Sequence, residues 1–353
     1  MARSVQLSVG LVALLVAVPV LAATKDLGPY GAEVQVAWSP DGKLLAVTTR
    51  GCNAQLVDPA TEKKKTRFKG DEDAQESALA FSPDGTRVAL ACQEGVAWIY
   101  DAASAAVVTT ILHGGSIRSL AFTSDGKALV TGGWQPHLAE DPDSIDPEAA
   151  TARVWDAVTG ARLQDLDGGT KNARSGVAAS PAGPVVAVAR DDGRLALFDL
   201  AAKKGPQLGL GDAEPAKGAV LEVKKRHEVE LGEPSHAVAF SKDGALVAAM
   251  GGKEAASATL VDATTGEVVR TFEKRSSSDP CPDGALAFSP DGAWLARVAP
   301  GVTGVQLFEV SSGKLAKTLG EGAGASVAFA PDGKTIALGL RNGRVLLIDL
   351  AGN

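Results

Sequence analysis

Four histidines are the first candidates for catalytic or metal-binding side chains, because imidazole acts both as a general acid–base and as a metal ligand. None of them belongs to a His-Glu-x-x-His sequence, in which two histidines one helical turn apart bind zinc. Zinc ligands typically follow short characteristic spacings, whereas these four are scattered along the chain. The sequence therefore predicts no metal site among them. The histidines are His113, His137, His227 and His236.

The serine and phosphate-binding motifs of common enzymes do not occur either. The chain contains no Gly-x-Ser-x-Gly sequence, the nucleophile elbow of α/β-hydrolases. Gly333-Lys334-Thr335 matches the end of a phosphate-binding loop, but Ala328 stands where that loop requires glycine. A hairpin turn explains these three residues better. We therefore predict no catalytic residue and no cofactor.

An acidic segment that follows two ring side chains is the third place where chemistry could occur. Carboxylates suit hard cations such as calcium, but their spacing here is not that of an EF-hand, and the prolines among them favour an extended chain. We therefore prefer a solvated acidic loop to a calcium site. Trp134 and His137 could anchor a partner or fold back over the protein, and the sequence leaves both open. The acids are Asp141, Asp143, Asp146 and Glu148.

A repeated hexapeptide indicates which elements position these residues. Residues 80–85 read Ala-Phe-Ser-Pro-Asp-Gly, and residues 287–292 repeat them letter for letter. Proline inside the turn and a left-handed glycine at its end are typical of a tight turn between two antiparallel strands. Seven such hairpins predict a repeat protein. The looser copies begin at Ala37, Ala121, Ala178, Ala239 and Ala328.

Each repeat ends in an apolar residue followed by an acid. In four copies the acid lies 16 residues after the turn glycine, as from Gly85 to Asp101. That spacing accommodates a strand, a short hairpin and a second strand, and a further strand follows the acid. Four strands in each of seven units predict an all-β fold, a seven-bladed β-propeller of four-stranded antiparallel blades. The closing acids are Asp58, Asp101, Asp156, Asp199, Asp262, Glu309 and Asp349.

We expect the ring to close by strand exchange between the ends of the chain. The last unit stops shortly after Asp349 and lacks an outer strand of its own. Residues 24–31, ahead of the first unit, can supply that strand. Closure would pair two sheet edges that would otherwise be prone to aggregation.

Over residues 30–353 these features resemble the WD-repeat β-propeller family. Val154-Trp155-Asp156, followed by Thr159-Gly160, is similar to the ending of that family's repeat, although the other repeats replace the tryptophan. His113 stands where the family has a structural histidine, and the resemblance implies Thr131 and Trp155 as its hydrogen-bond partners. Propellers host many roles, so the resemblance implies the fold more sharply than the function.

Two insertions interrupt the repeats. One lies around residues 134–150, between the second and third strands of the third repeat. The other follows Asp199 and lengthens either the outer strand of blade four or the loop leading into blade five. We expect both, together with an acidic loop at residues 71–76, on the face opposite the Ser-Pro-Asp-Gly turns. Insertions gathered on one face often mark the binding surface of a repeat protein.

This elaborated face is the predicted partner-binding surface. Two acidic groups in adjacent blades would lie beside a possible aromatic anchor, and like charges brought together favour a basic partner or a cation. The predicted binding residues are Trp134, His137, Asp71, Glu72, Asp73, Asp141 and Asp143.

Residues 1–22 have the pattern of a signal peptide. Arg3 precedes an uncharged apolar run, and Val20-Leu21-Ala22 fits the small-residue cleavage rule. An uncleaved membrane anchor is the alternative, but the run is short for a spanning helix. We expect residues 23–353 to form one domain without a membrane span, exported to the periplasm or the extracellular space as a monomer.

The three cysteines allow one plausible disulfide. Cys52 is expected in the hairpin tip of blade one, and Cys92 at the end of the second strand of blade two, so neighbouring blades could bring them within bonding distance. Free buried thiols are the alternative. Cys281, between blades five and six, is placed too far round the ring to join either.

The net charge and the motifs together limit the classes of function that this protein can have. The formal net charge of −7 disfavours nucleic-acid binding, which needs a basic face. The basic run at residues 224–227 is flanked by glutamates and predicts a salt-bridged strand. We expect an exported, non-enzymatic scaffold that binds a protein or a cell-envelope component. The alternative is a propeller enzyme of the lactonase or quinone-dependent type, with a site in its central funnel.

Overall fold

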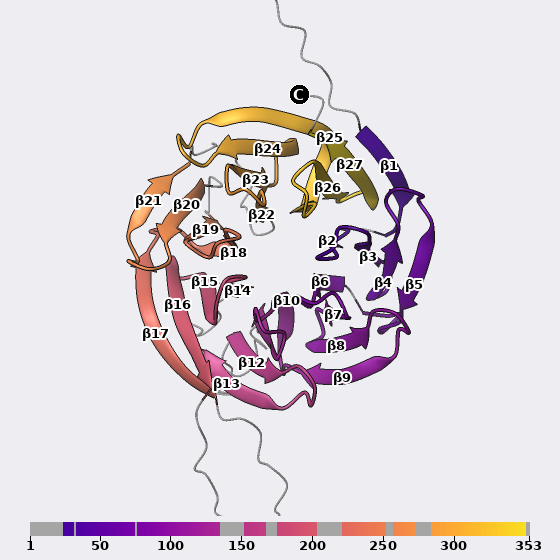
Figure 1. Cartoon of the computed structure of the whole chain (residues 1–353), viewed down its shortest axis with the longest axis horizontal. Coiled ribbons are helices and arrows are strands. Elements are labelled where there is room, and N and C mark those ends of the chain that lie inside the picture. The colour runs from indigo at the N-terminus through magenta and orange to yellow at the C-terminus, as the bar shows by residue number, and fades with distance from the viewer. Residues whose placement is uncertain are drawn as a thin grey trace, which may run out of the picture.

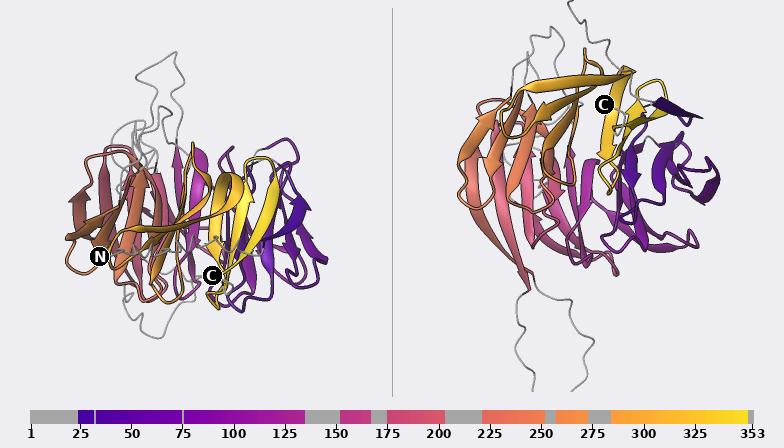
Figure 2. Two further views of the ribbon diagram at one scale, coloured as in Figure 1. Left: turned by 90° about the horizontal axis from the view of Figure 1, so that it is seen from above. Right: turned by 45° about the horizontal axis from the view of Figure 1, so that its top comes forward.

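Antiparallel strands form a ring of sheets around a central opening (Figure 1). The computed structural model describes residues 24–31, 33–74, 76–134, 152–166, 175–202, 221–251, 257–272 and 284–350. In side view the ring is a thick disc whose strands run between its two faces (Figure 2). The described residues form seven four-stranded blades, as the repeats predict.

The first strand of each blade lies beside the central opening and the last lies on the rim (Figure 1). Blade one consists of β2 (Val36–Trp38), β3 (Leu45–Thr49), β4 (Asn53–Val57) and β5 (Lys64–Phe68). Blade two consists of β6 (Glu76–Phe81), β7 (Arg87–Cys92), β8 (Val96–Asp101) and β9 (Val107–Leu112). Blade three consists of β10 (Ser116–Phe122), β11 (Ala128–Trp134), β12 (Ala152–Asp156) and β13 (Arg162–Leu166).

The next blades repeat this order. Blade four consists of β14 (Ser175–Ala179), β15 (Val185–Arg190), β16 (Arg194–Ala202) and β17 (Leu221–Glu230). Blade five consists of β18 (Ser235–Phe240), β19 (Leu246–Gly251), β20 (Ser257–Asp262) and β21 (Val268–Thr271). Blade six consists of β22 (Ala285–Phe288), β23 (Trp294–Val298), β24 (Thr303–Glu309) and the first part of β25 (Leu315–Phe329).

Blade seven closes the ring with strands from both ends of the chain. It consists of the second part of β25, β26 (Thr335–Leu340), β27 (Arg344–Asp349) and β1 (Thr24–Pro29). The N-terminal strand β1 pairs antiparallel with β27, with Thr24 opposite Ile348 and Pro29 opposite Arg344. The predicted closure by residues 24–31 is therefore confirmed.

The hydrophobic core lies between the blades. The middle strands are buried on both sides, because each blade is covered by two neighbours; all six residues of β15 are buried. One cluster joins Leu56 and Phe68 of blade one to Leu90 and Tyr100 of blade two. Rim strands such as β5, with sequence Lys-Lys-Thr-Arg-Phe, bury little of their length. Each blade thus depends on its neighbours for most of its apolar burial.

The repeated turns have the hydrogen bonds that their sequence predicts. In blade two the Ser82 hydroxyl donates to Asp84 Oδ1 over 2.6 Å, and Gly85 N donates to Ser82 O over 2.9 Å. Hydrogen bonds from Ser82 and from the Thr86 backbone lower the pKa of Asp84 to about 2. Gly85 has a φ of +72°, which favours glycine.

The proline of this turn has a second role that the hairpin alone does not reveal. A Cβ atom placed on Gly85 would lie 3.3 Å from Cδ of Pro40 in the preceding blade. Ser124 and Lys242 stand in place of the proline in two other turns. A Cβ atom placed on the glycine of the following turn, Gly183 and Gly292 respectively, would have no neighbouring atom within 4 Å. The turns therefore support one another around the ring. The other proline–glycine pairs are Pro331–Gly42, Pro83–Gly126 and Pro290–Gly333.

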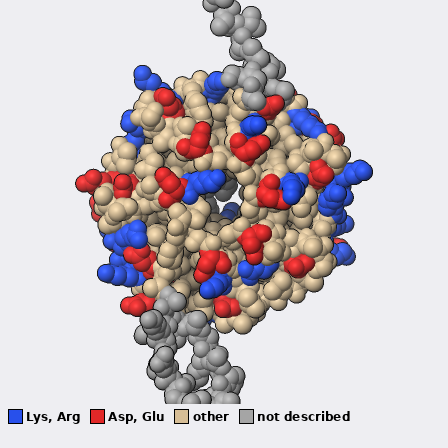
Figure 3. All heavy atoms as spheres, in the orientation of Figure 1, with Lys and Arg blue, Asp and Glu red and all other residues tan. Residues whose placement is uncertain are grey.

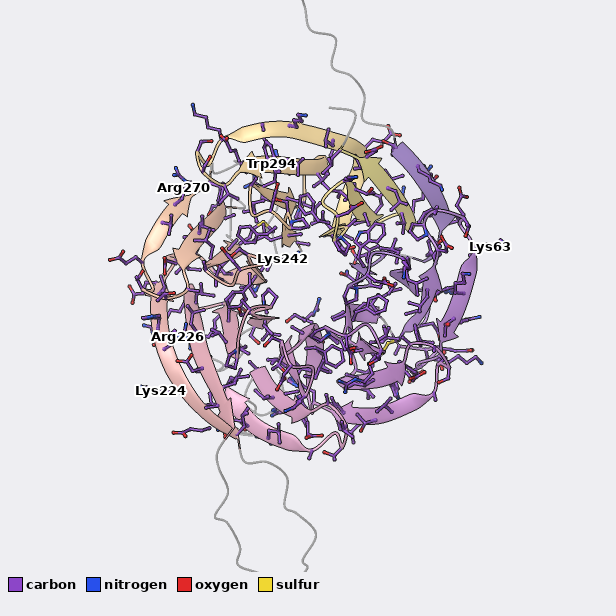
Figure 4. All side chains as sticks on the ribbon, in the orientation of Figure 1. Lys63, Lys224, Arg226, Lys242, Arg270 and Trp294 are labelled. Atoms are coloured by element: carbon purple, nitrogen blue, oxygen red, sulfur yellow. A yellow bond between two sulfur atoms is a disulfide. The ribbon has the colours of Figure 1, made fainter. Side chains whose placement is uncertain are left out.

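The two faces of the disc carry different connections. The turn face carries the Ser-Pro-Asp-Gly-type turns and the turns after the closing acids. The loop face carries the connections between second and third strands and those between blades. Acidic and basic side chains lie close together around the central opening in Figure 3. In Figure 4 Lys242 lies beside that opening.

One insertion begins and ends on the opposite face from the one predicted. It separates β16 from β17, the third and outer strands of blade four, whose ends Ala202 and Leu221 lie on the turn face, and residues 203–220 themselves lie outside the described residues. The prediction that every insertion lies on one face is wrong for this segment. The two strands continue as a paired hairpin as far as Ala202 opposite Leu221. Residues 231–234, which lead into blade five, form only a short connection.

Candidate functional site

A disulfide on the loop face joins the first two blades. Cys52 lies in the turn between β3 and β4, and Cys92 ends β7; their sulfur atoms are bonded, with Cα atoms 5.9 Å apart. Both cysteines are almost fully buried. Of the two alternatives left by the sequence, the structure contains the bridge. Cys281 lies outside the described residues.

The acidic connection between β5 and β6 rests directly against this disulfide. Asp71, Glu72 and Asp73 are exposed, whereas Ala74 is buried in the same apolar cluster as both cysteines. A Cβ atom on Gly51 would lie 2.5 Å from Glu72 O, so glycine allows the connection to pack closely on the β3–β4 turn. The exposed carboxylates of Asp71, Glu72 and Asp73 thus belong to a connection that is packed tightly against the protein.

Hydrogen bonds fix the start of the same connection. Gly70 N donates to Asn53 Oδ1 over 3.2 Å, and the Tyr100 hydroxyl donates to Lys69 O over 2.6 Å. The ammonium of Lys69 lies 3.8 Å from Glu72, but both side chains are more than 70% exposed. Such an exposed pair contributes little, so it leaves the acidic group available to another cation.

His113, Thr131 and Trp155 lie together in the interior of blade three. His113 Nδ1 lies 2.9 Å from Thr131 Oγ1, and the Trp155 indole N–H donates to the same oxygen over 2.8 Å. Burial, with smaller contributions from Arg153 and Arg162, lowers the pKa of His113 to about 3. The imidazole is therefore neutral at physiological pH and serves as a buried hydrogen-bonding group.

The other predicted binding residues belong to the connection between β11 and β12. Its ends lie on the loop face, where Gly132 pairs with Ala152. Trp134 ends β11, but its side chain lies outside the described part of the structure. His137, Asp141 and Asp143 also lie outside the described residues. Their proximity to the Asp71–Asp73 group stays a prediction.

A charged cluster in blade four was not anticipated from the sequence. Arg190, almost fully buried, lies 2.6 Å from Asp192 and 3.0 Å from Glu228 of the rim strand. His236 Nδ1 at the start of blade five lies 2.9 Å from Asp191 Oδ1. Three consecutive charged residues at a hairpin tip, residues 190–192, were the available signal. The cluster links the hairpin between β15 and β16 to the rim strand β17.

The basic run of β17 is paired, as predicted. Arg226 pairs with Asp199 of β16, and Lys225 lies 3.3 Å from Glu228. His227 Nε2 lies 2.7 Å from Thr264 O in blade five. His227 thus joins blade four to blade five, as does Arg226, whose Nη1 donates to Ala263 O over 3.3 Å.

A cavity of about 330 Å³ opens on the turn face between blades one and seven. Trp38, Pro59, Thr335 and Leu347 are among its lining residues, together with Asp41 and Asp332. The sequence signal was a tryptophan at the turn position where most repeats have phenylalanine. The second residue after each turn glycine was a further signal, because Thr335 is a short polar residue where four other repeats have the larger Leu44, Arg87, Leu246 and Trp294.

No three His, Cys, Asp or Glu side chains within the described ranges form a group that could hold a metal ion. Over the same residues, no helix has the length and apolar character needed to cross a bilayer.

Comparison with known proteins agrees with this architecture. The family model described as "WD domain, G-beta repeat" matches residues 106–138, which include β9, β10, β11 and His113. The chain is also similar to the solved β-propeller domain of Cps50 (Swd1) from Myceliophteria thermophila, with a TM-score of 0.72 and 13% sequence identity. That match covers 93% of this chain and 100% of the other. No curated protein matches the sequence.

These two matches differ in what they establish. At 13% identity the structural likeness shows the fold alone. The repeat match adds sequence features of the family in the outer strand of blade two and the first half of blade three. Together they support a WD-repeat propeller, a class whose general role is protein–protein interaction.

Proposed function

We propose that this protein is an exported scaffold whose loop face binds the basic surface of a partner protein. One observation carries the proposal: Asp71, Glu72 and Asp73 are exposed on a connection that is packed against a buried disulfide. A preorganised charged surface loses less conformational entropy on binding than a flexible one. The WD-repeat fold supports a protein as the partner.

The location outside the cytosol is part of this proposal. Disulfides persist in oxidising compartments and are rare where cytosolic thiols are kept reduced. The Cys52–Cys92 bridge therefore supports export, together with the signal-peptide pattern of residues 1–22. We place the mature chain, residues 23–353, in the periplasm or the extracellular space.

The acidic group should act mainly on the rate of association. Exposed charges at the edge of an interface steer the encounter of the two proteins. This steering weakens as the salt concentration rises and the Debye length falls below about 8 Å. The side chains of the β11–β12 connection would contribute the contacts that hold the complex, with Trp134 as the proposed anchor.

The test begins with capture of partners from the native envelope fraction by the mature protein. Association of the main captured protein is then measured for the parent and for Asp71→Asn/Glu72→Gln/Asp73→Asn. A control variant, Glu62→Gln/Glu267→Gln/Asp349→Asn, removes three carboxylates at the turn-face ends of other strands. We expect slower association, by about tenfold at low salt, in the loop-face variant alone. Unchanged association in that variant, or equal slowing in both, would reject the loop face as the binding surface.

A further inference from the structure

The cavity between blades one and seven has filled counterparts elsewhere in the ring. Between blades two and three the guanidinium of Arg87 occupies the corresponding place. Its Nη2 donates to Gly126 O over 2.5 Å, its Nη1 donates to Ala157 O over 3.2 Å, and it lies 5.5 Å from the Phe122 ring centroid. Arg87 is the second residue after its turn glycine.

At the other junctions an apolar cluster includes the residue at the Arg87 position. Between blades three and four the short Ala128 shares a cluster with Leu200. At the remaining junctions the residue at the Arg87 position shares a cluster with the turn aromatic of the next blade. These pairs are Leu44 with Phe81, Val185 with Phe240, Leu246 with Phe288, and Trp294, labelled in Figure 4, with Phe329.

Only the junction of blades seven and one combines a short polar residue with an open cavity among the described residues. Thr335 stands at the Arg87 position, and Trp38, Gly42 and Pro59 correspond to Phe122, Gly126 and Ala157. Both the aromatic wall and the glycine carbonyl that receive the guanidinium of Arg87 are therefore repeated here. The position that Arg87 holds at its own junction is Thr335 here, which carries no guanidinium.

The charges around the cavity favour a cation. Asp41 and Asp332 both line it, and each accepts a backbone hydrogen bond of its own turn through Oδ1. Lys43 lies 3.3 Å from Asp41 Oδ2, but its side chain is 81% exposed, so another cation can replace it at little cost. Lys25 donates to Pro59 O over 3.0 Å from the rim, which leaves the glycine carbonyl and the carboxylates for a ligand.

We propose that this cavity binds an arginine side chain of an extended segment of a partner protein. The guanidinium would lie against Trp38 and donate to Gly42 O, as Arg87 does with Phe122 and Gly126 O at the junction of blades two and three. It would in addition pair with Asp41 or Asp332. Arginine suits this role because its planar fork both stacks on aromatic rings and donates several hydrogen bonds. The site lies on the turn face, so the test of this proposal is independent of the test of the proposed loop-face function.

The probe is a blocked nonapeptide of glycine and serine with one central arginine. Its binding to the mature protein is followed through the indole N–H resonance of Trp38. Peptides with citrulline in place of arginine, and the free blocked amino acid N-acetyl-arginine amide, serve as comparisons. We expect saturable binding of the arginine peptide at millimolar concentration or better, and at least tenfold weaker binding of the other two.

Two variants test the assignment of the cavity. Thr335→Arg should fill it from within and weaken peptide binding at least tenfold. Asp332→Asn should weaken binding about threefold or more. Asp332 is chosen because its turn has Ala330 in place of serine, so the substitution breaks no serine–aspartate hydrogen bond. Leu246→Ala, at the junction of blades five and six, is the control and should bind normally.

Each contrary result overturns the proposal. No shift of the Trp38 resonance with the arginine peptide rejects the site, and equal binding by Thr335→Arg rejects the cavity. Equal binding of citrulline shows that the positive charge is not recognised. Equal binding of N-acetyl-arginine amide and the peptide would assign the site to free guanidino compounds rather than to a protein segment.

Discussion

Arg344, in the last strand of the ring, donates through Nε to Asp26 Oδ2 of the first described strand over 2.9 Å. This hydrogen bond is the main reason that the pKa of Asp26 lies below its usual value. The pair lies beside the backbone ladder that joins β1 to β27. The side chain of Asp26 is 33% exposed and that of Arg344 is 48% exposed. The backbone ladder rather than this exposed ion pair should therefore contribute most of the free energy that holds β1 to β27.

Deleting residues 23–32 should therefore destabilise the whole domain. The deletion removes β1 and exposes the edge of β27, and each blade relies on its neighbours for burial. We expect a lower midpoint in one cooperative thermal transition. Asp26→Asn, which removes only the ion pair, should cost about 1 kcal/mol or less. A truncated protein that melts like the parent would contradict the closure by β1.

Breaking the disulfide should destabilise the protein without changing its fold. The bridge closes a loop with a sequence separation of 40, for which the expected loss is about 2–4 kcal/mol. Cys52→Ala/Cys92→Ala is compared with the parent by urea denaturation, and Cys281→Ala is the control. Thiol titration of the unfolded, unreduced parent should find one free thiol. Three free thiols would show that the bridge does not form.

His113 should make stability depend on pH. Its pKa is about 3 in the folded protein and about 6.5 in an unfolded chain. Between these values the unfolded state binds more protons, so stability is complete above about pH 6.5 and falls as the pH drops towards 3. The slope attributable to this group approaches about 1.4 kcal/mol per pH unit. Urea denaturation at several pH values compares the parent with His113→Gln, which should lose that part of the slope; an unchanged slope would contradict the neutral, buried imidazole.

Restoring the missing prolines should stabilise the turn face. Lys242→Pro would place a proline ring beside Gly292, and Ser124→Pro would do the same beside Gly183. Each change should add about 0.4–1 kcal/mol, since proline also restricts the unfolded chain. Chemical denaturation measures the effect, with Lys242→Ala and Ser124→Ala as controls that remove the original side chains. Equal stability of the proline and alanine variants would argue against the contact between turns.

The β11–β12 connection gives a kinetic prediction for the proposed partner. Trp134→Ala should mainly speed dissociation, because an aromatic anchor acts in the formed complex. Asp141→Asn/Asp143→Asn should mainly slow association, because exposed charges act on the encounter. Surface plasmon resonance with the captured partner separates the two rates. Unchanged kinetics in both variants, together with loss of binding on changing the turn face, would place the interface on the other side.

The sequence by itself determined the blade count, the strand order and the closure. These features follow from local chemistry: a proline, an aspartate and a glycine such as Gly85 specify a hairpin wherever they recur, and seven hairpins leave one rim strand to be supplied. The partners of His113, Thr131 and Trp155, came from the resemblance to the WD-repeat family, which implies them within the same repeat.

Only the tertiary structure decided the contacts between blades. The sequence between Asp199 and Phe240 did not show on which face its insertion lies, because that depends on how far β16 and β17 remain paired. Likewise Thr335 and Trp38 are almost 300 residues apart in the chain, and only ring closure places them around one cavity. Packing between distant segments has no local sequence signature, so only the assembled ring decided between the Cys52–Cys92 bridge and free thiols, and only the ring showed the proline–glycine contacts and the turn-face cavity.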